Sequence, residues 1–297
     1  MTEGFDFNEA DIDVMLANLD SFSEEEVVEI DRMVDELSTR SKNKRAYDDL
    51  IEFCKLMMPD FIVGKHHRIL ADLLMGIESG EKDRICVNIP PRHGKSQLVS
   101  IFFPAWFLGR NPDKKVMMVS HTTDLAVDFG RKVRNLIALD VYRSIFPTVK
   151  LAQDSKSAGR WNTNVGGEYY ACGIGSALAG RGADLLLVDD PHSEQDVING
   201  NFGVFEKAYE WFTFGARTRL MPHGAVAIIQ TRWHLDDLTG RVVRDMGKNE
   251  RADQYDVVEF PAILDVLDKK TEKTVQKPLW PEFFDLEALL RTKASMP

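Results

Sequence analysis

The stretch Ile89-Pro-Pro-Arg-His-Gly-Lys-Ser96 is the strongest indication of the fold in this 297-residue sequence. An apolar run, Arg84–Ile89, leads into it, and the helix-like segment Lys95–Leu108 follows it up to a stop at Gly109. A buried strand, a tight loop with Gly-Lys-Ser and a helix are typical of a loop that binds phosphate, because the start of the helix presents unpaired N–H groups. The sequence therefore predicts a phosphate-binding loop.

Each residue type in this loop suits a bound nucleoside triphosphate. Gly94 lets the backbone approach the phosphates, Lys95 is expected to pair with the β- and γ-phosphates, and Ser96 to ligate Mg²⁺. The usual pattern has a glycine where this chain has Ile89, so an ordinary strand-to-helix turn stays open as the alternative for the loop alone. The loop residues expected to contact the nucleotide are Pro91, Arg92, His93, Gly94, Lys95, Ser96 and Gln97.

Another apolar run ends in two carboxylates. Leu185–Val188 is followed by Asp189 and Asp190, which would lie at the carboxyl end of a strand. Asp189 is expected to hold Mg²⁺, and Asp190 to orient and polarise the attacking water. A turn that caps a strand is the alternative for this pair alone, but downstream of Gly-Lys-Ser the pair indicates nucleotide hydrolysis.

Short apolar strands alternate with amphipathic helices from Arg84 onward, which predicts an α/β fold with a mostly parallel central sheet flanked by helices. The expected strands are Arg84–Ile89, Lys115–Ser120, Asp184–Val188, Ala225–Thr231 and Asp256–Phe260. The expected helices are Lys95–Leu108, Asp124–Ile137, Phe202–Arg217 and Asp236–Met246. An extra hairpin or edge strand is expected between Arg160 and Gly175.

The strand at 225–231 runs into Gln230, Thr231 and Arg232. Polar groups at such a strand end can sense the γ-phosphate and pass its state to a moving element. The alternative is an ordinary strand end. We hypothesise that Thr231 and Arg232 contact the nucleotide and couple its hydrolysis to motion.

The net charge of −10 is unevenly distributed. Residues 1–37 hold 13 acidic residues and one basic residue, and the remaining residues hold 34 acidic and 36 basic ones. Ser23 and Glu26 form a possible capping box for a helix up to Leu37, followed by a connector at 41–44 and a second helix at 45–58. The acidic helix is expected either to dock on the body or to serve as a docking arm for a partner.

Several other classes of protein are excluded by the sequence. No apolar run reaches the ~20 residues that a membrane span needs, and the acidic N-terminus does not resemble a secretory signal. Three scattered cysteines give neither a disulfide framework nor a zinc pair, which fits a soluble intracellular protein. The glycines and serine at 173–178 match neither a dinucleotide fingerprint nor a nucleophile elbow.

Three ordered motifs resemble the large terminase subunit of tailed bacteriophages. They are Ile89–Ser96, Gly175–Pro191 (GSALAGRGADLLLVDDP) and Gln230–Gly240 (QTRWHLDDLTG), and the similarity extends over about Phe53 to Pro297. The resemblance implies a P-loop NTPase of the ASCE/RecA-like type that uses ATP and Mg²⁺ to drive double-stranded viral DNA into a procapsid. It also implies a ring of subunits on the portal protein, with the small terminase subunit as a partner, in the host cytoplasm.

The resemblance also assigns roles to individual residues. Arg92 matches a basic residue that relatives often have in the loop, and His67, next to His66, falls where relatives often place a glutamine that contacts adenine. Surface histidines at a helix start are the alternative for this pair. An arginine supplied by a neighbouring subunit is expected to assist catalysis, with Arg181 as the first candidate and Arg134 and Arg160 as others.

The predicted organisation is an acidic helical extension at 1–40, an ATPase domain at 41–262 and a linker at 263–297. The segment after Phe260 is too short for the nuclease domain that such proteins usually carry, so no nuclease activity is expected in this chain. Two other functions remain open. One is a superfamily 2-like helicase or translocase, which would need a second ATPase-like domain, and the other is an assembly protein that binds nucleotide without hydrolysing it.

Overall fold

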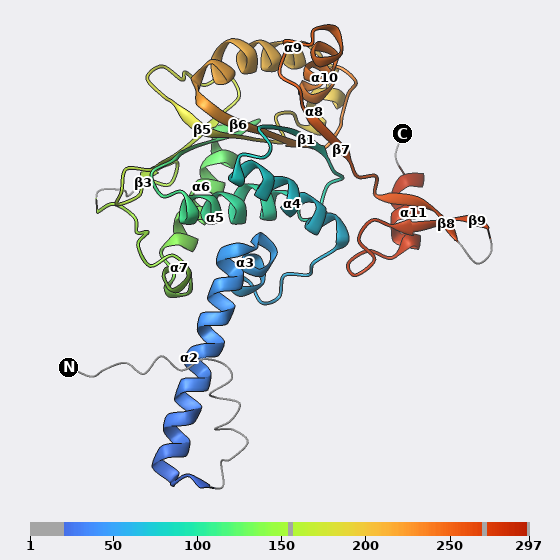
Figure 1. The fold of residues 1–297 in the computed structure, drawn as a ribbon. Helices are drawn as coiled ribbons and strands as arrows, with labels where there is room; N and C mark the ends of the chain where they lie inside the picture. The colour runs from blue at the N-terminus through green and yellow to red at the C-terminus, as the bar shows by residue number, and fades with distance from the viewer. Residues whose placement is uncertain (1–20, 154–156, 269–271, 296–297) are drawn as a thin grey trace.

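A computed structural model describes residues 21–153, 157–268 and 272–295, and a seven-stranded sheet forms its centre (Figure 1). The order of the strands is β3-β4-β2-β5-β6-β1-β7, and every neighbouring pair is parallel except β3 with β4. The strands are β1 Arg84–Asn88, β2 Lys115–Ser120, β3 Arg160–Asn162, β4 Glu168–Gly173, β5 Ala183–Asp189, β6 Leu220–Gln230 and β7 Asp256–Glu259. The five predicted strands and the additional edge strand are thus present.

Helices cover both faces of the sheet, as Figure 1 shows. One face carries α3 Leu50–Met57, α4 Lys65–Ser79, η2 Gln97–Phe102 with α5 Phe103–Arg110, α6 Thr123–Ile137 and α7 Asp140–Ile145. The other carries α8 Glu194–Ile198, α9 Gly203–Glu210 with η3 Trp211–Ala216 and η4 Arg217–Arg219, and α10 Leu238–Lys248. The predicted α/β fold class is confirmed.

Successive residues of β5 point to opposite faces of the sheet. Because helices cover both faces, the strand is buried on both sides and its apolar run is continuous. Leu185 and Leu187 pack in the core beneath α4, α5 and α6, while Leu186 and Val188 pack in the core beneath α9 and α10. Among the described residues, no helix has the length and apolar character that crossing a bilayer would require.

Gly109 does not end the helix that follows the phosphate loop. The helix continues to Arg110, and a Cβ built on Gly109 would lie 2.6 Å from the ring of Phe146, which is 2% exposed. The glycine is therefore required for close packing of α5 against the segment after α7, and the prediction of a helix stop was wrong.

We expect Gly109→Ala to lower the free energy of unfolding by about 1–3 kcal/mol, because the added methyl group would overpack a buried contact. Urea denaturation would measure the loss. Gly247→Ala in α10 is the matched control: nothing lies within 4 Å of its Cβ position, so the higher helix propensity of alanine should leave stability unchanged or slightly raised. Equal effects of the two substitutions would contradict the packing argument.

The connector expected at 41–44 is absent, because α2 Glu24–Asp48 runs through it without a break. The helix ends one turn later, at Asp49, whose side chain accepts from the N–H of Glu52 at 2.9 Å and pairs with Arg68. Asp49 thus caps α3 while it is held by α4. The break is fixed by these contacts and not by the polar residues before it.

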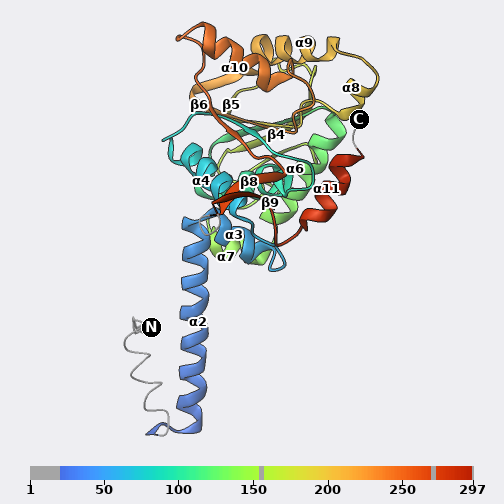
Figure 2. The same cartoon turned by 90° about the vertical axis from the view of Figure 1, so that its right-hand side faces the viewer.

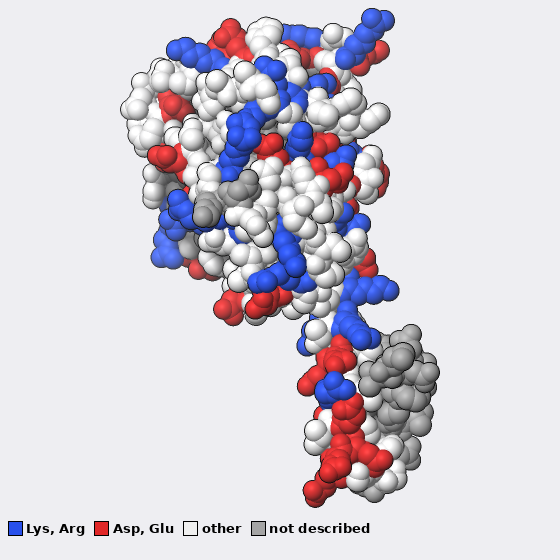
Figure 3. Space-filling view, turned by 90° about the vertical axis from the view of Figure 1, so that its left-hand side faces the viewer, with Lys and Arg blue, Asp and Glu red and all other residues white. Residues whose placement is uncertain are grey.

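The predicted capping box of the acidic helix is confirmed, with Ser23 and Glu26 bonded to each other's backbone N–H. The helix α2 projects from the body, and its C-terminal end alone lies against α3 and α7 (Figures 1 and 2). Its docking along the body was therefore a wrong prediction for residues 24–40, while residues 1–20 lie outside the described part. Figure 3 shows acidic side chains gathered on this arm and mixed charges on the body.

The segment after 262 is more regular than the expected linker. It forms a hairpin of β8 Ile263–Asp268 and β9 Lys273–Pro278, followed by the helix α11 Leu286–Ala294. Between the hairpin and the helix, Trp280 is buried against the start of α4. The division of the chain near residue 262 stays a prediction.

Candidate nucleotide-binding site

The order of the strands brings the three predicted motifs to one edge of the sheet. β1 lies beside β6, and β6 lies beside β5, so the phosphate loop, Thr231 and the Asp189–Asp190 pair all follow the carboxyl ends of adjacent strands. This edge is where open α/β sheets bind their ligands.

The ammonium group of Lys95 stands at the centre of this edge. Its Nζ lies 2.6 Å from Oδ2 of Asp190 and donates to Oγ1 of Thr231 at 3.2 Å, and its side chain is 8% exposed. The N–H of Thr231 donates to Oδ1 of Asp190 at 2.7 Å, so the carboxylate bridges β5 and β6. A largely desolvated cation whose partner is a single carboxylate is suited to receive a phosphate group.

Asp189 is 1% exposed and only partly satisfied. Its Oδ2 accepts from the hydroxyl of Ser100 at 2.6 Å, whereas its Oδ1 has no hydrogen-bond partner within the described residues. Burial and the neighbouring Asp190 raise the pKa of this carboxyl to about 6. A buried carboxylate oxygen without a partner fits a bound cation.

Asp189 and the hydroxyl of Ser96 supply the hard oxygen ligands that Mg²⁺ prefers. Within residues 21–153, 157–268 and 272–295, no group of three or more His, Cys, Asp or Glu side chains could hold a metal by itself. A Mg²⁺ that arrives with substrate phosphates needs only one or two protein ligands, so the two predicted residues fit such an ion.

The backbone of the phosphate loop explains why Ile89 is tolerated. The N–H of Ile89 donates to the carbonyl of Gln230 at 3.0 Å, so this residue simply extends the pairing of β1 with β6. Positive φ angles occur instead at Arg92 (60°) and Gly94 (75°). The first helical hydrogen bond runs from Leu98 to the carbonyl of Gly94, which leaves the preceding N–H groups available for an anion.

The predicted loop residues differ in exposure. Pro91 and Arg92 are exposed, His93 and Lys95 are buried, and the others are intermediate. His66 and His67 are 1% and 0% exposed and lie directly behind the loop, so the alternative of surface histidines is wrong. The structure therefore brings His67 to the site, although behind the backbone of the loop.

Arg181 is the predicted site residue that the structure does not bring together with Lys95. It precedes β5 and so lies at the amino-terminal edge of the sheet, opposite the phosphate loop. There it pairs with Glu168 at 3.1 Å and stacks on the ring of Tyr170, 4.6 Å from its centroid. Arg181 cannot act on a nucleotide in its own subunit, and a role in a neighbour's site stays a prediction.

Arg232 is held by a side chain that sequence reasoning missed. Its Nε donates to Oδ2 of Asp237 at 2.7 Å, and Oδ1 of Asp237 caps α10 by accepting from Gly240 at 2.9 Å. Asp237 is fully buried. The segment after β6 is thereby joined to α10, which gives the predicted coupling residues Thr231 and Arg232 a direct connection to a helix.

Ser100 was also missed, although the sequence holds a signal for it. Ser96 and Ser100 are one helical turn apart, so both can face the carboxylate at the end of β5.

His192, just after Asp190, was missed as well, and the sequence holds no such signal for it. Its Nε2 accepts from the N–H of Leu238 at 3.0 Å, so the segment after β5 is bonded to the first residue of α10.

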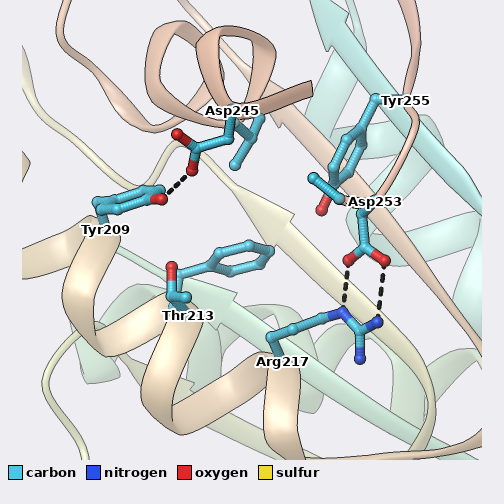
Figure 4. Close-up of a pocket in the computed structure, with 9 residues that line it drawn as sticks. Tyr209, Thr213, Arg217, Asp245, Asp253 and Tyr255 are labelled. Carbon is cyan, nitrogen blue, oxygen red and sulfur yellow. Dashed lines mark hydrogen bonds and ion pairs between the residues drawn. The ribbon is translucent and has the colours of Figure 1, made fainter. Parts of the chain in front are cut away.

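Two cavities differ in their relation to this site. One of about 430 Å³ adjoins the loop and is lined by Asn88, Ile89, Pro90, Pro91, Thr231, Arg232, Trp233, Glu259, Phe260 and Pro261. The other, of about 140 Å³, lies between η3, α10 and the segment before β7 (Figure 4). Its Arg217 is already paired with Asp253, and its Asp245 accepts a hydrogen bond from the hydroxyl of Tyr209, so the described lining residues offer no free cation to a nucleotide phosphate.

The fold and the arrangement of Lys95, Asp189 and Asp190 define an α/β protein of the P-loop class. Residues 86–286 match the family model of the large terminase subunit, T4-like-virus type, N-terminal part. The chain belongs to this family.

One solved structure supports the fold. The chain is similar to the large terminase of bacteriophage HK97, with 13% identity, a TM-score of 0.50, and coverage of 81% of this chain and 49% of that one. It also matches the large terminase of the thermophilic bacteriophage D6E in complex with ATP-γ-S, with 13% identity, a TM-score of 0.36, and coverage of 63% and 43%. The chain thus spans about half the length of these structures. No curated protein sequence matches it.

The buried His192 gives a testable pH dependence. Burial lowers its pKa to about 4, so the folded protein resists protonation that the unfolded chain accepts below about pH 6.5. The contribution of neutral His192 to the free energy of unfolding is fully present above pH 6.5 and is lost as the pH falls toward 4. We expect His192→Gln, which keeps an acceptor for Leu238, to reduce the difference in unfolding free energy between pH 7.5 and 5.0 by about 2 kcal/mol.

Urea denaturation at the two pH values would measure this difference. His223→Gln, at an exposed position in β6, is the control and should leave it unchanged. An unaltered pH dependence in His192→Gln would show that His192 is not held in its neutral form.

Proposed function

We propose that this chain is the ATPase motor of a terminase, which hydrolyses ATP with Mg²⁺ to move double-stranded viral DNA into a procapsid. The observation that carries the proposal is the cluster at one sheet edge. Lys95, Asp190 and Thr231 lie within hydrogen-bond distance of one another, and the buried Asp189, the last residue of β5, directly precedes Asp190. Membership of the large terminase family supports the assignment of DNA as the substrate that is moved.

In this proposal each residue has a defined task. The ammonium of Lys95 releases Asp190 and binds the β- and γ-phosphates, and the N–H groups at the helix start bind the same phosphates. Asp190, once released, orients and polarises the water that attacks the γ-phosphate. A Mg²⁺ held by Asp189 and Ser96 supplies neutralisation of the phosphate charge when bound.

The same geometry supports Thr231 and Arg232 as the coupling residues. Thr231 contacts both Lys95 and Asp190, and its neighbour Arg232 is paired with the cap of α10. A change at the γ-phosphate therefore has a short path to α10. The subunits are proposed to form a ring on the portal protein in the host cytoplasm, together with the small terminase subunit, and the isolated chain can be monomeric.

The test is Mg²⁺-dependent ATP hydrolysis as a function of protein concentration, with Lys95→Ala as the blank. Activity that rises faster than linearly and is lost in the variant supports an ATPase completed across a subunit interface by an arginine such as Arg181. Activity proportional to concentration would support the ATPase but exclude a catalytic arginine from a neighbouring subunit. No hydrolysis and no calorimetric binding of Mg²⁺-ATP would overturn the proposal.

A further inference from the structure

The carbonyl oxygen of His93, inside the phosphate loop, is held from behind by two buried histidines. Nε2 of His66 and Nε2 of His67 each lie 3.0 Å from this oxygen. Both histidines belong to the first turn of α4, which begins after Gly64. Since a carbonyl oxygen can only accept, both ring nitrogens must carry the proton of these hydrogen bonds.

A second contact fixes the tautomer of His67. Its Nδ1 accepts from the backbone N–H of Gly64 at 3.0 Å and is therefore unprotonated. The ring is thus neutral, with its proton on Nε2 and both nitrogens bonded. Burial lowers the pKa of His67 to about 3, which agrees with a ring that stays neutral throughout the physiological range.

The contact with His93 determines where the next amide points. In a planar trans peptide the carbonyl of His93 and the N–H of Gly94 face opposite directions. Because the oxygen is directed toward α4, the N–H of Gly94 is directed away from α4, to the side where the helix start and Lys95 would hold the phosphates. Gly94 has φ 75°, and a Cβ there would lie 2.2 Å from Nε2 of His67, so the contact also requires a glycine.

The histidines themselves are fixed from the other side by aromatic rings. Trp280 stands edge to face against His67, with ring centroids 4.8 Å apart, and against His66 at 5.5 Å. Phe61 packs against His67 at 5.2 Å. Gly64 leaves no room for a side chain, since its Cβ would lie 2.7 Å from both His66 and Trp280. The rings therefore have little freedom to turn toward a nucleotide base.

We propose that His67, assisted by His66, is a positioning residue that orients the amide of Gly94 toward the nucleotide phosphates, and that it does not contact the adenine base. This inference rests on the proposed nucleotide-binding function. It makes His67 part of phosphate recognition. Loss of His67 should therefore weaken the binding of every ligand that carries the triphosphate, whatever base the ligand has.

Three substitutions separate the two contacts of His67. His67→Gln can keep a donor for the His93 carbonyl, His67→Asn can keep only the acceptor for Gly64, and His67→Phe keeps the ring without either. Affinities for ATP, GTP and inorganic tripolyphosphate would be measured by calorimetry in the presence of Mg²⁺. Thermal melting of each variant would show whether it is folded.

We expect His67→Phe and His67→Asn to lower the affinity for all three ligands by the same factor, about tenfold. The affinities of His67→Gln should stay within about threefold of those of the wild type. Loss of ATP affinity with unchanged tripolyphosphate affinity would overturn the proposal in favour of a base contact. Unchanged affinity for all ligands in folded His67→Asn would overturn it as well.

A measurement without nucleotide keeps this test separate from the proposed function. Nitrogen-15 NMR of the unliganded protein at neutral pH should show His67 with its proton on Nε2. If the wild type shows this tautomer yet binds no triphosphate, the proposed function fails while the loop geometry stands. A proton on Nδ1 would remove the contact with Gly64 and overturn the positioning role directly.

Discussion

Asp190→Asn is expected to slow Mg²⁺-dependent ATP hydrolysis by about 10²–10⁴-fold, the usual contribution of a general base. Binding of ATP should stay the same or become tighter. The reason is that the carboxylate lies 2.6 Å from Nζ of Lys95 and competes with the incoming phosphates for this cation. The neutral amide of asparagine competes less. Single-turnover hydrolysis and calorimetric titration with ATP would measure the two effects separately.

Asp184→Asn is the matched control, since it removes a carboxylate from the opposite end of the same strand, where Asp184 pairs with Lys114 at 3.2 Å. This variant should hydrolyse ATP at nearly the wild-type rate. Wild-type hydrolysis in Asp190→Asn would show that another group activates the water. A wild type that binds Mg²⁺-ATP without hydrolysing it would favour the nucleotide-switch alternative.

Lys95→Ala is expected to lower ATP hydrolysis by about 10³-fold or more. The ammonium of Lys95 lies in a largely buried site, where water screens its attraction to the phosphate charges only weakly. Lys95→Ala should also weaken ATP binding and reduce the free energy of unfolding by about 3 kcal/mol or less. The substitution leaves Asp190 without its ionic partner and the buried Asp189 without a neighbouring cation. Hydrolysis assays and urea denaturation would report the two losses.

The double variant Lys95→Ala/Asp190→Asn separates the structural role of the pair from the catalytic one. Removing both partners of an ion pair costs less than removing one, so this variant should be more stable than Lys95→Ala. It should remain inactive. If the double variant were no more stable than Lys95→Ala, the 2.6 Å ion pair would contribute little to stability in solution.

Much of the fold could be predicted from local patterns. The strand at 115–120 has the predicted bounds, and β1, β5 and β7 differ from the predicted ones by no more than a residue at either end. Their apolar runs are continuous because both faces of the sheet are covered. Because these strands could be recognised in the sequence, the Gly-Lys-Ser and Asp-Asp motifs could be placed at strand ends.

The errors arose where a local signal competed with a tertiary contact. Gly109 was predicted to stop a helix, but its missing side chain makes room for Phe146. The polar residues at 41–44 were predicted to form a connector, but Asp49 ends the helix through its bonds to α3 and α4. Neither the ring of Phe146 nor Arg68 is a sequence neighbour of the residue that it affects.

Local sequence patterns were enough to predict the class of the fold, the phosphate loop and the carboxylates at the end of β5, because periodicity, glycine and charge are visible along the chain. Which groups meet became visible in three dimensions: Asp190 with Lys95, Arg232 with Asp237, and the two histidines with the His93 carbonyl. The tertiary structure also placed Arg181 at the far edge of the sheet. Such contacts depend on the order of strands and on burial, which bring together side chains that local sequence patterns cannot pair.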